Sequence, residues 1–110
     1  MEREIITFKH YFKEFFDGLS LKAQRKVIYV LSLLRVQRKL SAKFVKPIED
    51  GLFELRVKFE SNIYRIFFCF DDGNIVILFN GFQKKSQKTP KSEIEMALKL
   101  KKQYYEQKGK

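Results

Sequence analysis

The stretch Gly51-Leu52-Phe53-Glu54-Leu55-Arg56-Val57-Lys58-Phe59, followed closely by Asn62-Ile63-Tyr64-Arg65-Ile66-Phe67-Phe68, decides the fold of this 110-residue chain. Apolar and charged residues alternate through the first part, which is the period-two pattern of a strand with one buried face. A two-residue turn at Glu60-Ser61 pairs the two strands so that their large apolar residues share a face. This register predicts that Arg56 lies directly opposite Arg65.

A third strand is expected after a strong hairpin signal. Asp72-Gly73 favours a tight turn between antiparallel strands, and the apolar run Ile75–Asn80 follows it. With a two-residue turn, Asn80 lies beside Arg65. The lysine-rich segment Gly81–Lys88 then leaves the sheet at the end where the arginines lie, so three segments build one basic pocket.

Helical periodicity and turn signals place the remaining elements. They predict a short strand over Glu4–Phe8, a helix over Lys9–Phe16, a longer helix from an N-cap at Ser20 to about Leu40, and a last helix opened by Thr89-Pro90. The expected fold class is α+β: a small antiparallel sheet with two N-terminal helices packed on one face and a C-terminal helix. Without a repeat or linker, residues 1–110 are expected to form a single domain.

The charge balance indicates the kind of partner. Lys+Arg number 23 against Asp+Glu 13, a net charge of +10, which favours a polyanion, either nucleic acid or an acidic protein. The alternative is a solvated basic surface without a partner. Cys69 is the only cysteine, and the apolar runs are far shorter than the roughly 20 residues that span a bilayer. We therefore expect a cytoplasmic protein with no membrane partner.

The arginine pair is the strongest candidate site. Like charges directly opposed in a strand pair cost roughly 0.2–1 kcal/mol, so the pattern suggests an anion that compensates them. Arg56 and Arg65 are predicted to clamp a phosphate, whose geometry a guanidinium matches. Further candidates are Lys58, Lys84 and Lys85 for the reaction, and Lys88, Phe82 and Asn80 for RNA binding. The alternative is that these charged side chains are simply exposed to solvent on one face of the sheet and bind nothing.

Other chemistries find little support in the sequence. His10 is the only histidine and Cys69 the only cysteine, so no Cys/His zinc cluster can form, and no motif around His10 indicates a Ser-His-Asp set. The glycines are dispersed and form no phosphate-binding loop. Asp71-Asp72 is explained by the hairpin turn rather than by a metal. We therefore expect neither a metal nor a cofactor.

At this point a family resemblance can be stated. The run Leu52-Phe53-Glu54-Leu55-Arg56, then Tyr64-Arg65, then Gly81-Phe82-x-Lys84-Lys85 with Lys88-Thr89-Pro90 opening a helix, resembles the RelE/HigB-like toxins of type II toxin–antitoxin systems, and most of all their phage-derived HigB-like branch. The resemblance implies a small, metal-independent endoribonuclease that cuts mRNA, typically on a translating ribosome. It also implies a cognate antitoxin, expected to be a helix-turn-helix protein.

The reaction implied by the resemblance is attack of a 2′-hydroxyl on its own phosphate. Family members use basic residues that fall here on Arg56, Lys58 and Arg65, and on Lys84 and Lys85 after the last strand. Several relatives carry a tyrosine or histidine near the C-terminus for proton transfer, and residues 81–102 of this chain contain neither. The proton would then pass to Lys58, Lys84 or Lys85, with a pKa lowered by cationic neighbours, or the ribosome would supply much of the orientation.

Two other functions remain open on sequence alone: a non-enzymatic toxin resembling the ParE inhibitors of gyrase, and a nucleic-acid-binding module without toxicity. The Glu-Leu-Arg and Phe-x-Lys-Lys elements favour the ribonuclease. The predicted outer face of the sheet, with Phe67, Cys69, Val76 and Leu78, is partly apolar. We expect the last helix to cover some of it and an acidic antitoxin segment to cover the rest.

Overall fold

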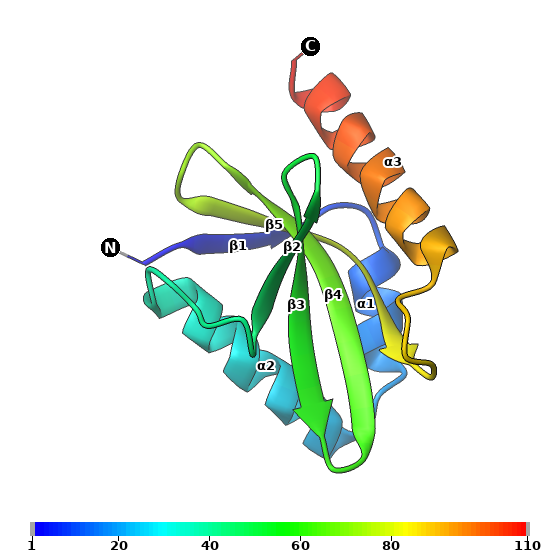
Figure 1. The fold of residues 1–110 in the computed structure, drawn as a ribbon. Helices are drawn as coiled ribbons and strands as arrows, with labels where there is room; N and C mark the ends of the chain where they lie inside the picture. The colour runs from blue at the N-terminus through cyan, green and yellow to red at the C-terminus, as the bar shows by residue number, and fades with distance from the viewer. Residues whose placement is uncertain (1, 110) are drawn as a thin grey trace.

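The computed structural model describes residues 2–109, which form a twisted five-stranded sheet between helices (Figure 1). In chain order the elements are β1 (Glu4–Thr7), α1 (Tyr11–Asp17), α2 (Leu21–Val36), β2 (Val45–Glu49), β3 (Leu52–Phe59), β4 (Asn62–Asp71), β5 (Ile75–Lys84) and α3 (Lys91–Lys108). The strand order is β1-β5-β4-β3-β2, with β1 parallel to β5 and every other pair antiparallel. The predicted α+β class is confirmed.

Each face of the sheet buries its own hydrophobic cluster. On one face, Leu55 and Ile66 pack with Val27 of α2, and aromatic residues of α1 join them. On the other face, Phe67 packs with Leu100 of α3. Because the central strands are covered on both faces, β4 reads as an almost continuous apolar run rather than as a clean alternation.

The β3–β4 hairpin has the register that the sequence predicts. Phe59 pairs with Asn62, and Arg56 lies directly opposite Arg65. Glu60 in the turn has a φ of 56°, in the left-handed region that tight hairpin turns use. The central prediction, two arginines side by side on neighbouring strands, is therefore confirmed.

The turn between β4 and β5 is longer than predicted. Residues 72–74 form the loop, and Asp71 pairs with Ile75. One extra residue in a turn moves every following side chain to the opposite face of the sheet. Val76 and Leu78 therefore belong to the core beneath α1 and α2, and the prediction that they lie on the outer face is wrong.

A second shift of register follows within the same strand pair. Ile66 pairs with Gly81 but Phe68 pairs with Leu78, so β5 holds one extra residue at this point, as in a β-bulge. As a consequence Phe82, and not Asn80, lies opposite Arg65. The predicted neighbour of this arginine is therefore wrong by two residues.

Strand β2 was not predicted from the sequence. It pairs with β3 through the turn at Asp50-Gly51, where φ is 51° and 75°. Pro47 cannot donate to a ladder, so it is tolerated because β2 is the edge strand of the sheet. Helix α2 ends at Val36 rather than near Leu40, and Ser20 caps its start as predicted, its side chain accepting from the backbone N–H of Ala23 at 3.2 Å.

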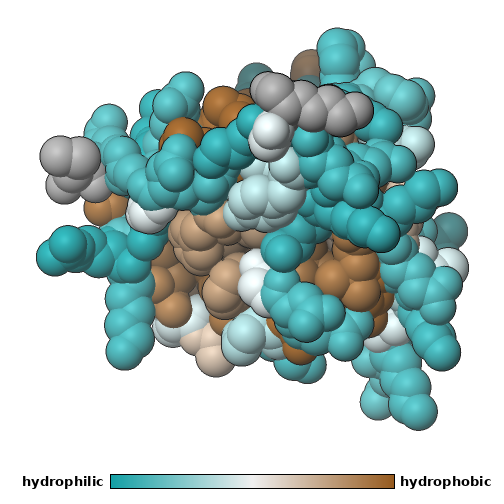
Figure 2. All heavy atoms as spheres, turned by 90° about the horizontal axis from the view of Figure 1, so that it is seen from above, coloured by the Kyte–Doolittle hydropathy of each residue, from teal (hydrophilic) through white to brown (hydrophobic). Residues whose placement is uncertain are grey.

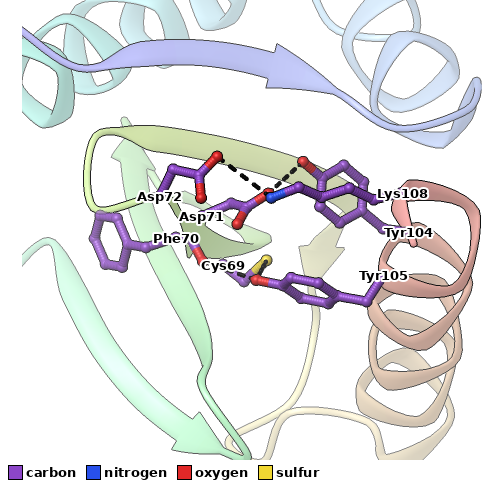
Figure 3. A network of polar contacts seen from close by, with 7 residues as sticks. All are labelled: Cys69, Phe70, Asp71, Asp72, Tyr104, Tyr105 and Lys108. Atoms are coloured by element: carbon purple, nitrogen blue, oxygen red, sulfur yellow. Dashed lines mark hydrogen bonds and ion pairs between the residues drawn. The ribbon is translucent and has the colours of Figure 1, made fainter. Parts of the chain in front are cut away.

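Helix α3 is held on the sheet by polar contacts at its C-terminal end (Figure 3). The hydroxyl of Tyr104 donates to Asp71 at 2.7 Å, and Lys108 donates to the same carboxylate at 2.7 Å. The hydroxyl of Tyr105 donates to the carbonyl of Phe70 at 3.0 Å. In Figure 1 the β3–β4 hairpin extends well beyond the other end of this helix. The helix therefore packs near the β4–β5 turn and does not extend over the β3–β4 turn.

Seen from the end of the molecule where α3 finishes, hydrophilic residues cover most of the surface, and hydrophobic ones show mainly in the gaps between them (Figure 2). No helix within residues 2–109 combines the length and the hydrophobicity needed to cross a membrane.

Candidate functional site

The half of the sheet beyond the reach of α3 carries three rows of residues paired across neighbouring strands, and paired residues share a face. The rows are Lys46–Glu54, then Arg56–Arg65–Phe82, then Lys58–Ile63–Lys84. We call this surface the basic face and define it by its five cationic residues: Lys46, Arg56, Lys58, Arg65 and Lys84. A single carboxylate, that of Glu54, stands among them.

Glu54 is the residue that organises the two arginines. Its side chain is 2% exposed, with Oε1 3.4 Å from Nε of Arg65 and Oε2 4.0 Å from Nε of Arg56. Thr89, which was predicted as a helix cap, instead donates its hydroxyl to Oε1 of Glu54 at 3.0 Å. The protein itself therefore supplies, in Glu54, part of the negative charge that offsets the two opposed arginines. Sequence reasoning missed this role because strand alternation gave Glu54 only an exposed position.

The two arginines differ in burial, since Arg65 is buried and Arg56 is partly exposed. The Arg65 side chain is 7% exposed, and its Nη1 donates to the carbonyl of Tyr64 at 3.1 Å. Its Nε has no hydrogen-bond partner among the described residues. Burial lowers the pKa of Arg65, and Arg56 lowers it further while Glu54 opposes them. Arg56 is 34% exposed, and its Nη1 donates to the carbonyl of Ala42 at 3.4 Å, so a buried guanidinium and a partly exposed one lie side by side.

The environment of Lys84 differs from that of the other two lysines that the sequence singled out, Lys58 and Lys85. It ends β5 in a partly buried position, across from Ile63. Burial lowers the pKa of Lys84, Arg65 and Arg56 lower it further, and Glu54 opposes them. By contrast Lys85 lies just past the strand and is exposed, as is Lys58 on the basic face. Of the three lysines that the sequence singled out, Lys84 has the environment that favours a neutral amine.

The three residues predicted to bind RNA lie in different places. Phe82 is half-buried on the basic face and stacks on Phe67, with ring centroids 5.8 Å apart. Asn80 is 4% exposed, and its Nδ2 donates to the carbonyl and to the carboxylate of Glu93, at 3.1 and 3.0 Å. It therefore ties β5 to α3 away from the basic face. Lys88 is exposed in the loop before α3.

A hollow of about 210 Å³ adjoins the basic face at the edge of β3. We call it the edge hollow. Its cationic lining consists of Arg56, Lys58 and Arg65 from the sheet, with Lys26 of α2 and Lys43 of the segment before β2. The sequence gives no signal for the last two, because a lysine outside the apolar stripe of a helix looks merely solvated. Only the packing of α2 beneath the sheet and the path of the chain into β2 bring them to the arginines.

Comparison with known proteins places the chain in a family. The model of the family described as "Phage derived protein Gp49-like (DUF891)" matches residues 14–102. Two relatives from Mycobacterium tuberculosis, strains CDC 1551 / Oshkosh and H37Rv, are each named "Probable endoribonuclease HigB1". Each is 37% identical over 87 residues, which cover 79% of this chain and 68% of the relative. The chain belongs to the Gp49-like family of HigB-like toxins.

A solved structure agrees with this HigB-like fold. The archaeal RelE–RelB complex from Pyrococcus horikoshii OT3 contains a chain that matches with a TM-score of 0.55 at 14% identity, covering 81% of this chain and 100% of that one. At this identity the likeness shows the shared fold alone.

The C-terminal tyrosines of this HigB-like toxin lie far from the basic face. Asp71 lies six positions beyond Arg65 in β4, which is about 20 Å at about 3.3 Å per residue, and the hydroxyl of Tyr104 donates to Asp71. Burial raises the pKa of Tyr104 and of Tyr105 to about 12. Neither tyrosine can serve chemistry at Arg65. No group of three or more His, Cys, Asp or Glu side chains within residues 2–109 is arranged to hold a metal ion.

Proposed function

We propose that this HigB-like toxin is an endoribonuclease that cleaves mRNA, in association with the ribosome, at the basic face. The observation that carries the proposal is that Arg56, Arg65 and Lys84 lie on one face at the same end of the sheet, with the pKa of Lys84 lowered. The family supports it, since the Mycobacterium tuberculosis relatives are named as probable endoribonucleases.

The proposed reaction is an internal transfer at phosphorus. The 2′-oxygen forms a bond to the adjacent phosphorus, the bond from phosphorus to the 5′-oxygen breaks, and the products are a 2′,3′-cyclic phosphate and a 5′-hydroxyl. The neutral amine of Lys84 takes the proton of the 2′-hydroxyl and later releases it to solvent, and a solvent water molecule donates a proton to the departing 5′-oxygen. Arg56 and Arg65 stabilise the extra negative charge on the phosphoryl oxygens, a task that suits groups which stay protonated.

The test uses Arg56→Ala and Arg65→Lys. Removing a group that stabilises charge in the transition state costs about 10²- to 10³-fold in rate, so Arg56→Ala should abolish growth inhibition and strongly slow mRNA cleavage on ribosomes. Arg65→Lys keeps a cation beside buried Glu54 and separates loss of activity from loss of folding. Arg25→Ala, on the exposed side of α2, is the control that removes the same charge. Full cleavage by both soluble site variants would refute the assignment.

The proposed partner is a cognate antitoxin, a helix-turn-helix protein encoded beside the toxin. Helix α2 carries an apolar stripe on its outer side, in which Leu21, Ile28, Tyr29 and Val36 are 72%, 55%, 53% and 54% exposed. The same helix contains four basic residues and no acidic one. A second copy of this chain would set like charges against each other, whereas an acidic amphipathic segment matches both the stripe and its charge.

The partner proposal has a direct test. Co-expression with the neighbouring gene should allow both proteins to be purified together, and Ile28→Glu should abolish this association because it places a charge in the apolar stripe. RNA cleavage by Ile28→Glu should remain, since the stripe lies apart from the basic face. Gln107→Glu, on α3, adds the same charge elsewhere as a control. Retention of the complex by Ile28→Glu would exclude the stripe as the docking surface.

A further inference from the structure

We propose that the edge hollow seats one nucleoside unit of single-stranded RNA, with its base on an apolar floor and its phosphate on Lys26 and Lys43. The inference rests on the proposed ribonuclease function and deepens it by assigning a second contact to the RNA beside the phosphate that is cleaved. With a volume of about 210 Å³ the hollow is smaller than the about 300 Å³ at which pockets for drug-sized ligands begin, and so suits a single unit.

The charge of the lining selects an anion. Five cationic side chains line the hollow, and no acidic residue is among the described residues that line it. Lys26 comes from α2 and Lys43 from the segment before β2, so two elements converge on the side of the hollow away from the basic face. A single phosphate at Arg56 and Arg65 would leave these two lysines without a counter-ion. A second phosphate of the same strand supplies one.

The floor of the hollow is apolar and suits a base rather than a phosphate. Val30 and Val57 are fully buried beneath it, while Phe44 and Ile63 are half-buried and keep part of their surface open. An aromatic face is the usual support for an unpaired RNA base; every base has a π-face and can stack, and differences in stacking strength give a modest base preference. Nζ of Lys43 lies 5.5 Å from the centroid of the Phe44 ring, so the aromatic and phosphate contacts are adjacent.

The free edge of β3 adds hydrogen-bonding groups to the same place. The backbone N–H of Arg56 donates to the carbonyl of Phe44 at 2.7 Å, so it points away from β4. Along β3, the backbone groups of every second residue point in this same direction. The next outward position is Lys58, and β2 does not reach it because Val45 already pairs with Leu55. The N–H and C=O of Lys58 therefore face the hollow at an open strand edge, where a base can hydrogen-bond with them.

The hollow and the basic face share Arg56, Lys58 and Arg65 in their linings. A nucleoside in the hollow would therefore be a close neighbour of the phosphate between the two arginines. Its base would be read by stacking and by the backbone of β3, which gives the toxin a base preference next to the cleaved bond. This preference belongs to the protein itself and does not depend on the ribosome.

The experiment measures binding and cleavage separately. Binding uses a short single-stranded 2′-O-methyl RNA, which lacks the attacking hydroxyl, and cleavage uses the matching unmodified RNA on ribosomes. The variants are Lys26→Ala with Lys43→Ala, and Phe44→Leu, which keeps an apolar side chain in the core but removes the aromatic face. The control is Lys22→Ala with Arg25→Ala, which removes the same charge from exposed positions of α2.

The double lysine variant should bind the 2′-O-methyl RNA more weakly and with a salt slope lower by about 0.7 log unit, because one phosphate contact to the single strand is lost. Phe44→Leu should weaken binding by about fivefold or more and reduce differences among RNAs that vary in one base. The control should bind as the wild type does. Unchanged affinity, salt slope and base preference in both variants would overturn the inference, whereas absence of RNA cleavage by the wild type would overturn the proposed function.

Discussion

At the scale of single residues, Glu54 explains how two opposed arginines are tolerated. Its carboxylate is buried, Arg65 lies on one side of it, and the hydroxyl of Thr89 fixes Oε1. Removing one member of a buried ion pair leaves a charge without compensation, which is more costly than never having had the pair. Glu54 is thus as important to the geometry of the basic face as the arginines themselves.

Glu54→Gln should therefore destabilise the protein. The amide keeps the shape of the side chain but leaves Arg65 buried without a counter-ion, at a cost of about 3 kcal/mol. Added inorganic phosphate should restore part of the loss, because an anion can then take the place of the carboxylate between the arginines. Urea unfolding with and without phosphate measures both effects, and Glu49→Gln at the exposed edge strand is the control. Equal stability of Glu54→Gln and the wild type would contradict this view of Glu54.

Lys84 leads to a prediction about pH. A general base acts in its neutral form, so cleavage should rise with pH and level off at the pKa of Lys84, which lies below the usual 10.5. Lys84→Arg should retain RNA binding but lose most of this rise, because arginine stays protonated. Cleavage rates of the wild type and of Lys84→Arg between about pH 7 and pH 9.5 measure this rise with pH. Lys85→Arg, one residue beyond the strand, is the control, and an unchanged pH profile in Lys84→Arg would exclude Lys84 as the base.

At the scale of elements, the sequence predicted the β3–β4 hairpin and its register because one short turn and a clean alternation determine both. The pairing of β4 with β5 could not be predicted, since it depends on one extra residue in the turn and another in the bulge. Neither leaves a signal in strands that are apolar on both faces. Strand β2, by contrast, has a signal in the sequence. Asp50-Gly51 is the same kind of turn signal as Asp72-Gly73, and in both turns the two residues have φ above zero.

The contact between α1 and β5 depends on Gly81. A Cβ built on this residue would lie 2.5 Å from Cδ2 of Phe15, well inside contact distance. Gly81→Ala should therefore push α1 from the sheet and destabilise the protein by about 1–3 kcal/mol, the usual cost of overpacking. In a Phe15→Leu background the same substitution should cost less, because the smaller side chain makes room. Thermal unfolding of the wild type, the two single variants and the double variant measures these differences in stability. An equal loss of stability from Gly81→Ala in both backgrounds would show that Phe15 is not the obstacle.

At the scale of the whole molecule, two distant regions of the sheet have different tasks. The end near the β4–β5 turn anchors α3, and the end near the β3–β4 turn carries the basic face. The sequence predicted Arg56, Arg65 and Lys84 because they lie on one hairpin and the strand after it. Lys26, Lys43, Lys46 and Thr89 escaped prediction because only the packing of α2, β2 and α3 around the sheet brings them to the same place.

The anchor of α3 should make the stability of the molecule depend on acid. Lys108 and Tyr104 hydrogen-bond to Asp71 and hold its pKa below the usual 3.8. A carboxylate with a depressed folded pKa contributes stability that is present above its unfolded pKa and is lost as the pH falls through the folded value. Asp71→Asn should therefore be less stable than the wild type at neutral pH, and the difference should shrink as the pH falls from about 4 to about 2. Because the basic face lies about 20 Å away along β4, RNA cleavage by folded Asp71→Asn should match the wild type.

Urea unfolding across this pH range measures the stability of Asp71→Asn and of the wild type. The control is Asp72→Asn, which changes an exposed partner of Lys108. A deficit that stayed constant down to the lowest pH would mean that Asp71 stabilises the fold by its shape rather than by its charge.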